Sequence, residues 1–207
     1  MAKQYGKLKI YANKPGTVAE GIQTLRAIED AYLMLYATEL HIEFLLETYS
    51  GRRRFRFDMP LPFYPYAPGL TSRHNLLSPE DVRKTMLLPE DVLLIGSVQF
   101  ESPGFWEFLG TLNPLDQLRK YVQDRHERKK DVAYRNEMER RKLQNENELL
   151  ETELFRNRVS ALREAGYTAQ EVRRLMLPAT QALGVVSERQ EDGLIEKAIL
   201  ELDETEG

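Results

Sequence analysis

A stretch of about fifty residues, from Pro114 to Ala165, contains no internal glycine or proline. Gly110 lies shortly before this stretch and Gly166 follows it directly. At about 1.5 Å per residue, a continuous helix of that length would extend roughly 75 Å, more than twice the width of a small domain. We therefore expect residues 113–165 to form one long charged helix that stands away from a separate compact domain.

The distribution of charge supports this division. Residues 1–118 carry 12 basic and 14 acidic side chains, residues 119–142 carry 10 and 5, and residues 143–207 carry 7 and 14. The net charge of −4 therefore hides a basic band that is followed by an acidic end. We predict a domain over 1–112, the long helix over 113–165, a short helical segment over 166–186, and an acidic tail over 187–207 that is a marginal helix or disordered.

The composition excludes several classes of site. The chain has no cysteine, so disulfide bonds and thiolate metal sites are excluded, which fits a reducing compartment. No leader with a basic and then an apolar part is present, and no run of 18 apolar residues occurs. The most apolar long stretch, residues 22–46, includes six Arg, Asp, Glu or His side chains. We expect a cytoplasmic protein without a membrane span.

The first part of the chain predicts a strand and a long helix. Residues 7–11 alternate polar and apolar side chains, the pattern of a half-buried strand with Leu8 and Ile10 inward. Thr17 and Glu20 form a capping-box pattern, which predicts a helix from there to about Tyr49. That helix is apolar on more than one face, so we expect a sheet on one side and a second cover on the other, for which a partner subunit is one candidate. Its predicted buried residues are Ile22, Leu25, Ile28, Tyr32, Leu35 and Tyr36.

The following segments complete the predicted domain. Residues 51–58 alternate like a second strand, and four prolines within 60–69 predict an extended loop. Ser78-Pro79 predicts a short helix to about Leu88. Residues 92–100 are continuously apolar at their centre, which is typical of a central strand covered on both faces. Ser102-Pro103 repeats the helix-start pattern and predicts a short aromatic turn of helix, with Gly110 and Asn113-Pro114 as a hinge.

These elements predict an α+β fold. It has a small sheet of three or four strands with helices on one face, followed by the long charged helix, which is coiled-coil-like, and a short helical tail. In the tail, Gly166 should end one helix, and Thr168 with Glu171 should start another that stops at Pro178.

Apolar residues recur at roughly heptad spacing along the predicted long helix. Because such a helix gains little by standing alone in water, we predict that these residues drive homo-oligomerisation. The predicted oligomerisation residues are Leu115, Leu118, Val122, Leu143, Leu150, Leu154, Val159 and Leu162.

Two further groups of residues suggest binding. Phe105, Trp106 and Phe108 form an aromatic patch that anchors at a membrane surface, docks a partner or is buried under the sheet. Basic residues beside aromatic ones can bind phosphates while bases stack, so nucleic-acid binding is an alternative function. The candidate contacts are Arg52, Arg53, Arg54, Arg56, Arg128, Lys129 and Lys130, although acidic residues are interspersed along the same helix.

Catalytic patterns are absent from the sequence. Its three histidines, His41, His74 and His126, show no metal-ligand spacing. It contains no Gly-x-Ser-x-Gly motif and no glycine-rich phosphate loop between a strand and a helix. We therefore predict no catalytic residue, no metal site and no cofactor, and an enzyme is the least supported reading.

A resemblance points in the same direction. The run Ser-Pro-Gly-Phe-Trp-Glu-Phe-Leu-Gly-Thr-Leu-Asn-Pro over 102–114 is followed by Leu-Asp-Gln-Leu over 115–118 and Asp-Arg-His-Glu-Arg-Lys-Lys-Asp over 124–131. In residues 90–135 the chain resembles a group of uncharacterised bacterial proteins with an α/β domain and a charged helix. It also resembles bacterial relatives of the N-terminal domain of the tumour-necrosis-factor-receptor adaptor protein, which are suspected adaptors in defence-type systems. The resemblance implies an adaptor and transfers no catalytic residue; members often carry a transmembrane segment, for which this sequence has no candidate.

The leading hypothesis from the sequence is a non-enzymatic cytoplasmic adaptor or scaffold. Its domain over 1–112 would bind a protein partner, and its long helix would cause self-association. A nucleic-acid-binding protein is the first alternative, and an enzyme of unknown class is the second.

Overall fold

The computed structural model describes residues 4–12, 16–49, 78–99, 104–132 and 155–202. The side chains of 47–49, 128–132 and 202 are outside this description. The strand predicted over 51–58 and the loop predicted over 60–69 therefore lie outside the described residues.

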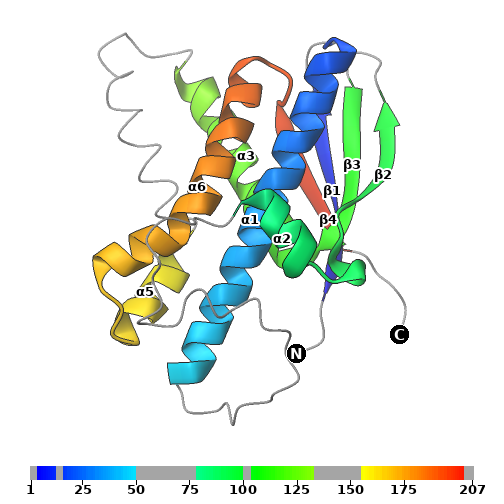
Figure 1. The fold of residues 1–207 in the computed structure, drawn as a ribbon. Coiled ribbons are helices and arrows are strands. Elements are labelled where there is room, and N and C mark those ends of the chain that lie inside the picture. Colours follow the sequence, from blue (N-terminus) through cyan, green and yellow to red (C-terminus); the bar gives the residue numbers. More distant parts are fainter. Residues whose placement is uncertain (1–3, 13–15, 50–77, 100–103, 133–154, 203–207) are drawn as a thin grey trace.

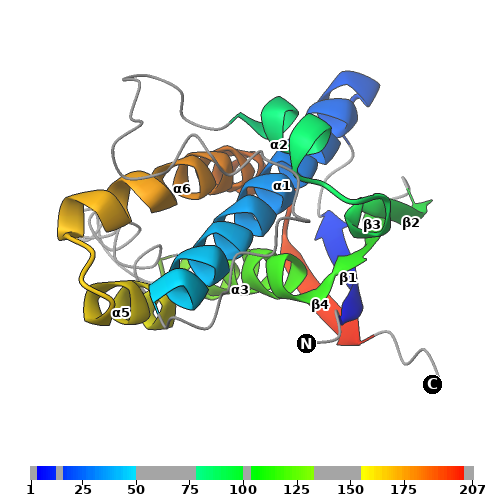
Figure 2. The ribbon, with the colours of Figure 1, turned by 60° about the horizontal axis from the view of Figure 1, so that its bottom comes forward.

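The described chain contains a four-stranded antiparallel sheet with the strand order β2-β3-β1-β4. Figures 1 and 2 show the long helices on one face of this sheet. The connections follow the split βαβ, or ferredoxin-like, scheme, in which β3 lies between β1 and β2. This confirms the predicted α+β class and the small sheet. In chain order the elements are β1 (Tyr5–Ala12), α1 (Val18–Tyr49), α2 (Pro79–Thr85), the 3-10 helix η2 (Pro89–Asp91), β2 (Leu94–Gln99), β3 (Gly104–Thr111), α3 (Leu112–Val132), α5 (Arg156–Glu164), α6 (Ala169–Glu191) and β4 (Lys197–Leu202).

The first strand, β1, lies inside the sheet and pairs with both β3 and β4. Its residues alternate between half-buried and buried, and the side chains of Leu8 and Ile10 are completely buried. The period of two in the sequence predicted this strand correctly, because successive side chains of a strand point to opposite faces.

The predicted aromatic turn of helix is wrong, because residues 104–111 form the central strand β3. Trp106 and Phe108 point to the helix-covered face and are buried, whereas Phe105 and Glu107 alternate with them on the other face. The alternation of side chains in residues 104–111, which is typical of a strand, decides the local structure here, and the Ser-Pro pattern of a helix start does not. Gly110 is not a hinge: it lies in the strand, and a Cβ there would be 3.1 Å from the Tyr32 hydroxyl oxygen.

The predicted position of residues 92–100 within the sheet is also wrong. Residues 92–100 were expected to form a central strand covered on both faces, but β2 is the edge strand of the order β2-β3-β1-β4. Five of its six residues are exposed. A continuous apolar run is typical of a buried strand, yet here nothing in the described chain covers it.

The long helix α1 begins at the predicted capping box. The Glu20 carboxylate accepts from the Thr17 backbone N–H at 2.7 Å, and the Thr17 hydroxyl accepts from the Glu20 N–H at 3.2 Å. Every residue from Ala31 to Glu39 is buried, so this part of α1 is covered on all sides. The second cover comes from the same chain, because α6, α3 and α5 pack along α1 (Figures 1 and 2), and α3 also contacts strands β1 and β4 of the sheet. Of the predicted buried residues, Ile22 is instead 49% exposed.

The single long helix predicted over 113–165 is wrong for the described residues. Figure 1 shows that α5 does not extend the axis of α3 but lies beside the later part of α1. An ion pair of 2.7 Å between Arg158 and Glu39 joins α5 to α1. The described part of the chain therefore shows no coiled-coil rod.

The C-terminal part returns to the sheet. Gly166 ends α5 with φ of 93°, and the capping box of Thr168 and Glu171 starts α6, both as predicted. However, α6 continues through Pro178, which was predicted to stop it. The lost backbone bond costs about 3 kcal/mol, but burial of Met176 and Leu183 against the core contributes about 1.5–3 kcal/mol each.

The acidic tail predicted over 187–207 as a marginal helix or disordered differs from the structure in its described part. Residues 187–191 belong to α6, and residues 197–202 form β4 beside β1. The Gln190 side chain fixes this junction, because its amide donates to the carbonyls of Val122 at 2.9 Å and Glu196 at 3.3 Å. The predicted segments therefore share one sheet and one core.

The position of α3 in the core leads to a first prediction. Leu118 is fully buried among residues of the same chain, so Leu118→Ala should lower the free energy of unfolding by about 2–5 kcal/mol. Lys120→Ala, a change on the exposed side of the same helix, should shift it by about 0.5 kcal/mol or less. Urea unfolding measures both values. An unchanged unfolding energy in Leu118→Ala, together with a changed particle mass, would contradict the position of α3.

A second prediction concerns pH. His41 is 5% exposed, and burial lowers its pKa from 6.5 to about 4. The unfolded chain therefore binds a proton at His41 more tightly than the folded chain does. The folded state keeps its full stability above pH 6.5 and loses stability as the pH falls toward 4. The loss approaches about 1.4 kcal/mol per pH unit. The free energy of unfolding, measured at several pH values, should fall less steeply with decreasing pH in His41→Leu than in wild type. His126→Leu is the control. Parallel curves for wild type and His41→Leu would contradict the prediction.

Candidate functional site

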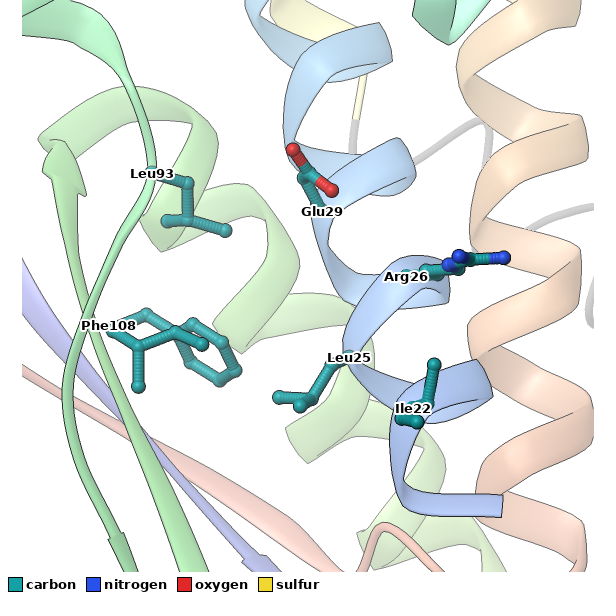
Figure 3. Close-up of a pocket in the computed structure, with 7 residues that line it drawn as sticks. Ile22, Leu25, Arg26, Glu29, Leu93 and Phe108 are labelled. Atoms are coloured by element: carbon teal, nitrogen blue, oxygen red, sulfur yellow. The ribbon is translucent and has the colours of Figure 1, made fainter. Parts of the chain in front are cut away.

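A groove lies between the first half of α1 and the edge strand β2. Its volume is about 260 Å³. Figure 3 shows Leu93 and Phe108 on the sheet side of the groove, with Leu25 and Ile22 opposite them on α1. The groove is lined by Ile22, Leu25, Arg26, Glu29, Leu93, Ile95 and Phe108.

The register of the sheet explains why the groove is apolar. Ile95 is paired with Phe108, whose side chain is buried on the helix-covered face, so Ile95 points to the same side. Leu94 points to the other side of β2. Ile95 is nevertheless 55% exposed and Leu94 is 56% exposed. Both faces of this strand therefore present large apolar side chains to the solvent.

Several exposed apolar residues are close in sequence to those that line the groove. Large apolar side chains that are more than a third exposed are usually scattered singly on a protein surface. Here most of those in the described chain are close in sequence to β2 or to the start of α1: Val18, Ile22, Leu88, Val92, Leu94 and Ile95.

A polar rim lies beside the apolar part of the groove. Arg83 of α2 contacts Glu29 at 3.1 Å and Asp30 at 3.8 Å, and it also binds Glu80 of its own helix. Partial burial raises the pKa of Asp30, and the neighbouring Glu29 carboxylate adds to this effect while Arg83 opposes it. An apolar centre with a charged rim is the usual composition of a protein interface.

A buried hydrogen-bond network holds the segment that leads into β2. Asp91 is completely buried and accepts from the Tyr36 hydroxyl at 2.6 Å and from the Thr111 hydroxyl at 3.3 Å. The Tyr32 hydroxyl donates to the Asp91 carbonyl at 2.8 Å and accepts from the Thr111 N–H at 3.0 Å. Burial raises the pKa of Tyr32 and of Tyr36, so both phenols keep the protons that they donate. The network links the segment that precedes β2 to α1 and to the end of β3.

The structure places the predicted oligomerisation residues in different surroundings. Leu115, Leu118, Val122 and Leu162 are completely buried in the core of the chain, and Val159 packs against that core. Their exposure was the reason to expect self-association, so that reason does not hold for these five. Leu143, Leu150 and Leu154 lie outside the described residues, and self-association through them stays a prediction.

Most of the other predicted binding residues are not described by the structure. Arg52, Arg53, Arg54 and Arg56 lie outside the described residues, and Arg128, Lys129 and Lys130 lie on the part of α3 whose side chains are not described. Within the aromatic patch, Trp106 is 5% and Phe108 2% exposed, while Phe105 points to the opposite face of the sheet.

The groove was missed by the sequence analysis. One signal was available: residues 92–99 contain no charged residue and no proline. This run was interpreted as a buried strand, because periodicity alone does not distinguish a buried strand from an unprotected edge.

Comparison of the chain with protein families, with curated proteins and with solved structures gives no match. The resemblance to bacterial adaptors therefore stays a prediction. In the part of the chain that the structure describes, no group of three His, Cys, Asp or Glu residues could hold a metal ion. None of the described helices is long and apolar enough to cross a membrane.

The buried network supports a third prediction. Tyr36→Phe removes a donor from the buried Asp91 carboxylate, which should lower the free energy of unfolding by about 1.5–3 kcal/mol. It should also speed hydrogen exchange at the β2 amides, because the segment before this strand loses an anchor. Tyr11→Phe removes a hydroxyl from the half-buried side of β1 and should leave both measurements nearly unchanged. Equal effects of the two substitutions would contradict this role of Asp91.

Proposed function

We propose that the protein is a non-enzymatic adaptor that binds an extended apolar segment of a protein partner at β2 and the adjacent groove. The observation that carries this proposal is an uncharged edge strand, with Leu94 and Ile95 more than half exposed, beside an apolar groove. The resemblance to bacterial adaptors, described from the sequence, agrees with this class of function.

An edge strand of this kind needs an explanation. Proteins usually protect a sheet edge with charged residues, proline, a bulge or a covering segment, because unpaired backbone groups invite another strand. Residues 92–99 have neither charge nor proline, and no described strand pairs with the outer edge of β2. The register shift between Ile95 and Ser97 is the one protective device seen there.

Strand addition fits this edge. An added peptide gains affinity from backbone hydrogen bonds and specificity from pockets for alternate side chains. The irregularity between Ile95 and Ser97 interrupts the ladder, so the partner segment should pair with residues 93–95. One of its side chains would then enter the groove, while the next would lie against Leu94.

The size of the groove favours a side chain over a small substrate. Sites for small molecules usually measure about 300–1,000 Å³ and enclose most of the ligand. This groove has a volume of about 260 Å³ and is apolar at its centre. A large apolar side chain of a partner protein, with the rest of its segment lying along β2, suits such a space.

Peptide selection tests the proposal. A display library of random extended peptides is selected on the immobilised full chain and then counter-selected on Ile95→Lys. We expect enriched peptides with alternating apolar residues that protect the β2 amides from hydrogen exchange. Burying one isoleucine contributes about 1.5–3 kcal/mol, so Ile95→Lys should weaken their binding by at least about tenfold.

A matched control is available on the other edge strand. Ile199 of β4 is 42% exposed, and Ile199→Lys should leave peptide affinity unchanged. The proposal fails if no selected peptide distinguishes wild type from Ile95→Lys, or if bound peptides protect no β2 amide. It also fails if the purified chain pairs with itself through β2, shown by a dimer mass that Ile95→Lys reduces to that of a monomer.

A further inference from the structure

The face of the sheet opposite the helices carries a second group of residues. Leu8 and Ile10 of β1 point into the core, so Lys9 and Tyr11, which alternate with them, point to the other face. Figures 1 and 2 show that the described helices leave this face uncovered. It is the side of the four-stranded sheet that no described helix covers, and the residues of β1 and β3 on this side are half-buried.

Two aromatic rings meet near one end of this open face. Tyr11 of β1 is paired in register with Phe105 of the adjacent strand β3. Their ring centroids are 6.4 Å apart, and the ring planes are inclined by 50°. The two central strands of the sheet thus present adjacent aromatic surfaces at the same level.

Two lysines lie over these rings. The Lys9 ammonium nitrogen is 3.8 Å from the Phe105 centroid and 5.6 Å from that of Tyr11. Lys197 of β4 places its nitrogen 4.9 Å from the Tyr11 centroid. Among the described residues, neither lysine forms an ion pair with a carboxylate. Within the described part of the chain, their positive charge therefore lies against aromatic rings, in contacts worth about 0.5–1 kcal/mol each at exposed sites, which are weak enough for an anion to replace.

We propose that these four residues, Lys9, Tyr11, Phe105 and Lys197, form an open-face cluster that binds single-stranded nucleic acid. Two successive bases stack on the rings of Tyr11 and Phe105, and the two ammonium groups move from the rings to the adjacent phosphates. One class of RNA-binding module, a four-stranded sheet with aromatic side chains on one face, stacks two or three bases in this manner. Single strands are favoured over duplexes because only unpaired bases can leave their stack to reach the rings.

The charges on the rest of the face limit the size of this site. Glu107 and Glu201 lie on the same face, and Lys7 is paired with Glu107 at 3.7 Å. Glu107 is paired in register with Lys9 and so borders the cluster itself, whereas Glu201 is paired with Lys7, farther from Tyr11; phosphates would be repelled beside both acids. The net charge of the chain, −4, provides no general attraction to nucleic acid. The footprint should therefore be short, and its affinity modest and strongly dependent on salt.

This inference is independent of the proposed adaptor function. It uses the side of the sheet away from the groove and includes neither Leu94 nor Ile95. It also differs from the nucleic-acid site predicted from the sequence, with which it shares no residue. A protein ligand on this face is a competing outcome, and the experiment separates the two.

Fluorescence anisotropy with labelled single-stranded oligonucleotides of DNA and RNA tests the site, with a duplex of equal length as the comparison. We expect single strands to bind more tightly than the duplex. Lys9→Gln combined with Lys197→Gln should weaken binding at least tenfold, and it should reduce the slope of log affinity against log salt by about 1.4, because each phosphate contact contributes about 0.7. Tyr11→Leu combined with Phe105→Leu should weaken binding by more than about tenfold, since stacking contributes about 1–3 kcal/mol per base.

The matched control removes the same charge elsewhere. Lys84 and Lys120 lie on α2 and α3, and the double change to glutamine should leave oligonucleotide affinity nearly unchanged. Emission from Trp106, the single tryptophan and a buried one, verifies that each variant remains folded. The proposal is overturned if no oligonucleotide binds at about 100 μM protein in about 25 mM salt. It is also overturned if duplex binds as well as single strands, or if the Lys84/Lys120 variant loses as much affinity as the Lys9/Lys197 variant.

Discussion

The burial of α1 on all sides is the constraint on which the rest of the structure depends. Nine consecutive residues, Ala31 to Glu39, are buried, so water is excluded from the whole circumference of this helix. One sheet face covers only one side of a helix. The remaining sides need α6, α3 and α5, and the energy of burying their apolar residues, of the order of 1.5–3 kcal/mol for each large side chain, outweighs the local cost of a proline inside α6.

This constraint also determines which surfaces remain for binding. Because α3 and α6 are used to cover α1, Leu118 and Leu183 are core residues and are unavailable to a partner. The cover does not extend to the start of α1, where the groove beside β2 stays open. It also leaves the far side of the sheet without a described helix. One surface is apolar and the other combines lysines with aromatic rings, so they suit ligands of different chemistry.

Local patterns predicted local structure well, and the errors have a common origin. The capping boxes at Thr17 and Thr168, the glycine cap at Gly166 and the alternation in β1 all depend on residues a few positions apart. The failures concern β3, where a Ser-Pro start was preferred to alternation, and β2, where an apolar run was interpreted as buried. The groove and the open-face cluster join residues about seventy to one hundred and ninety positions apart, such as Ile22 with Ile95 and Tyr11 with Lys197. Such proximity depends on strand order.

The sequence by itself determined the class of the fold, the position of most helix starts, and an apolar character in residues 28–36 that had to be covered. It also contained the uncharged run 92–99. Only the tertiary structure decided that the chain covers α1 with its own helices, that β2 is an edge, and that Lys9 and Lys197 both lie over the ring of Tyr11. The physical reason is that helix caps and periodicity arise from short-range geometry, whereas strand order and burial depend on the energy of contacts between distant segments.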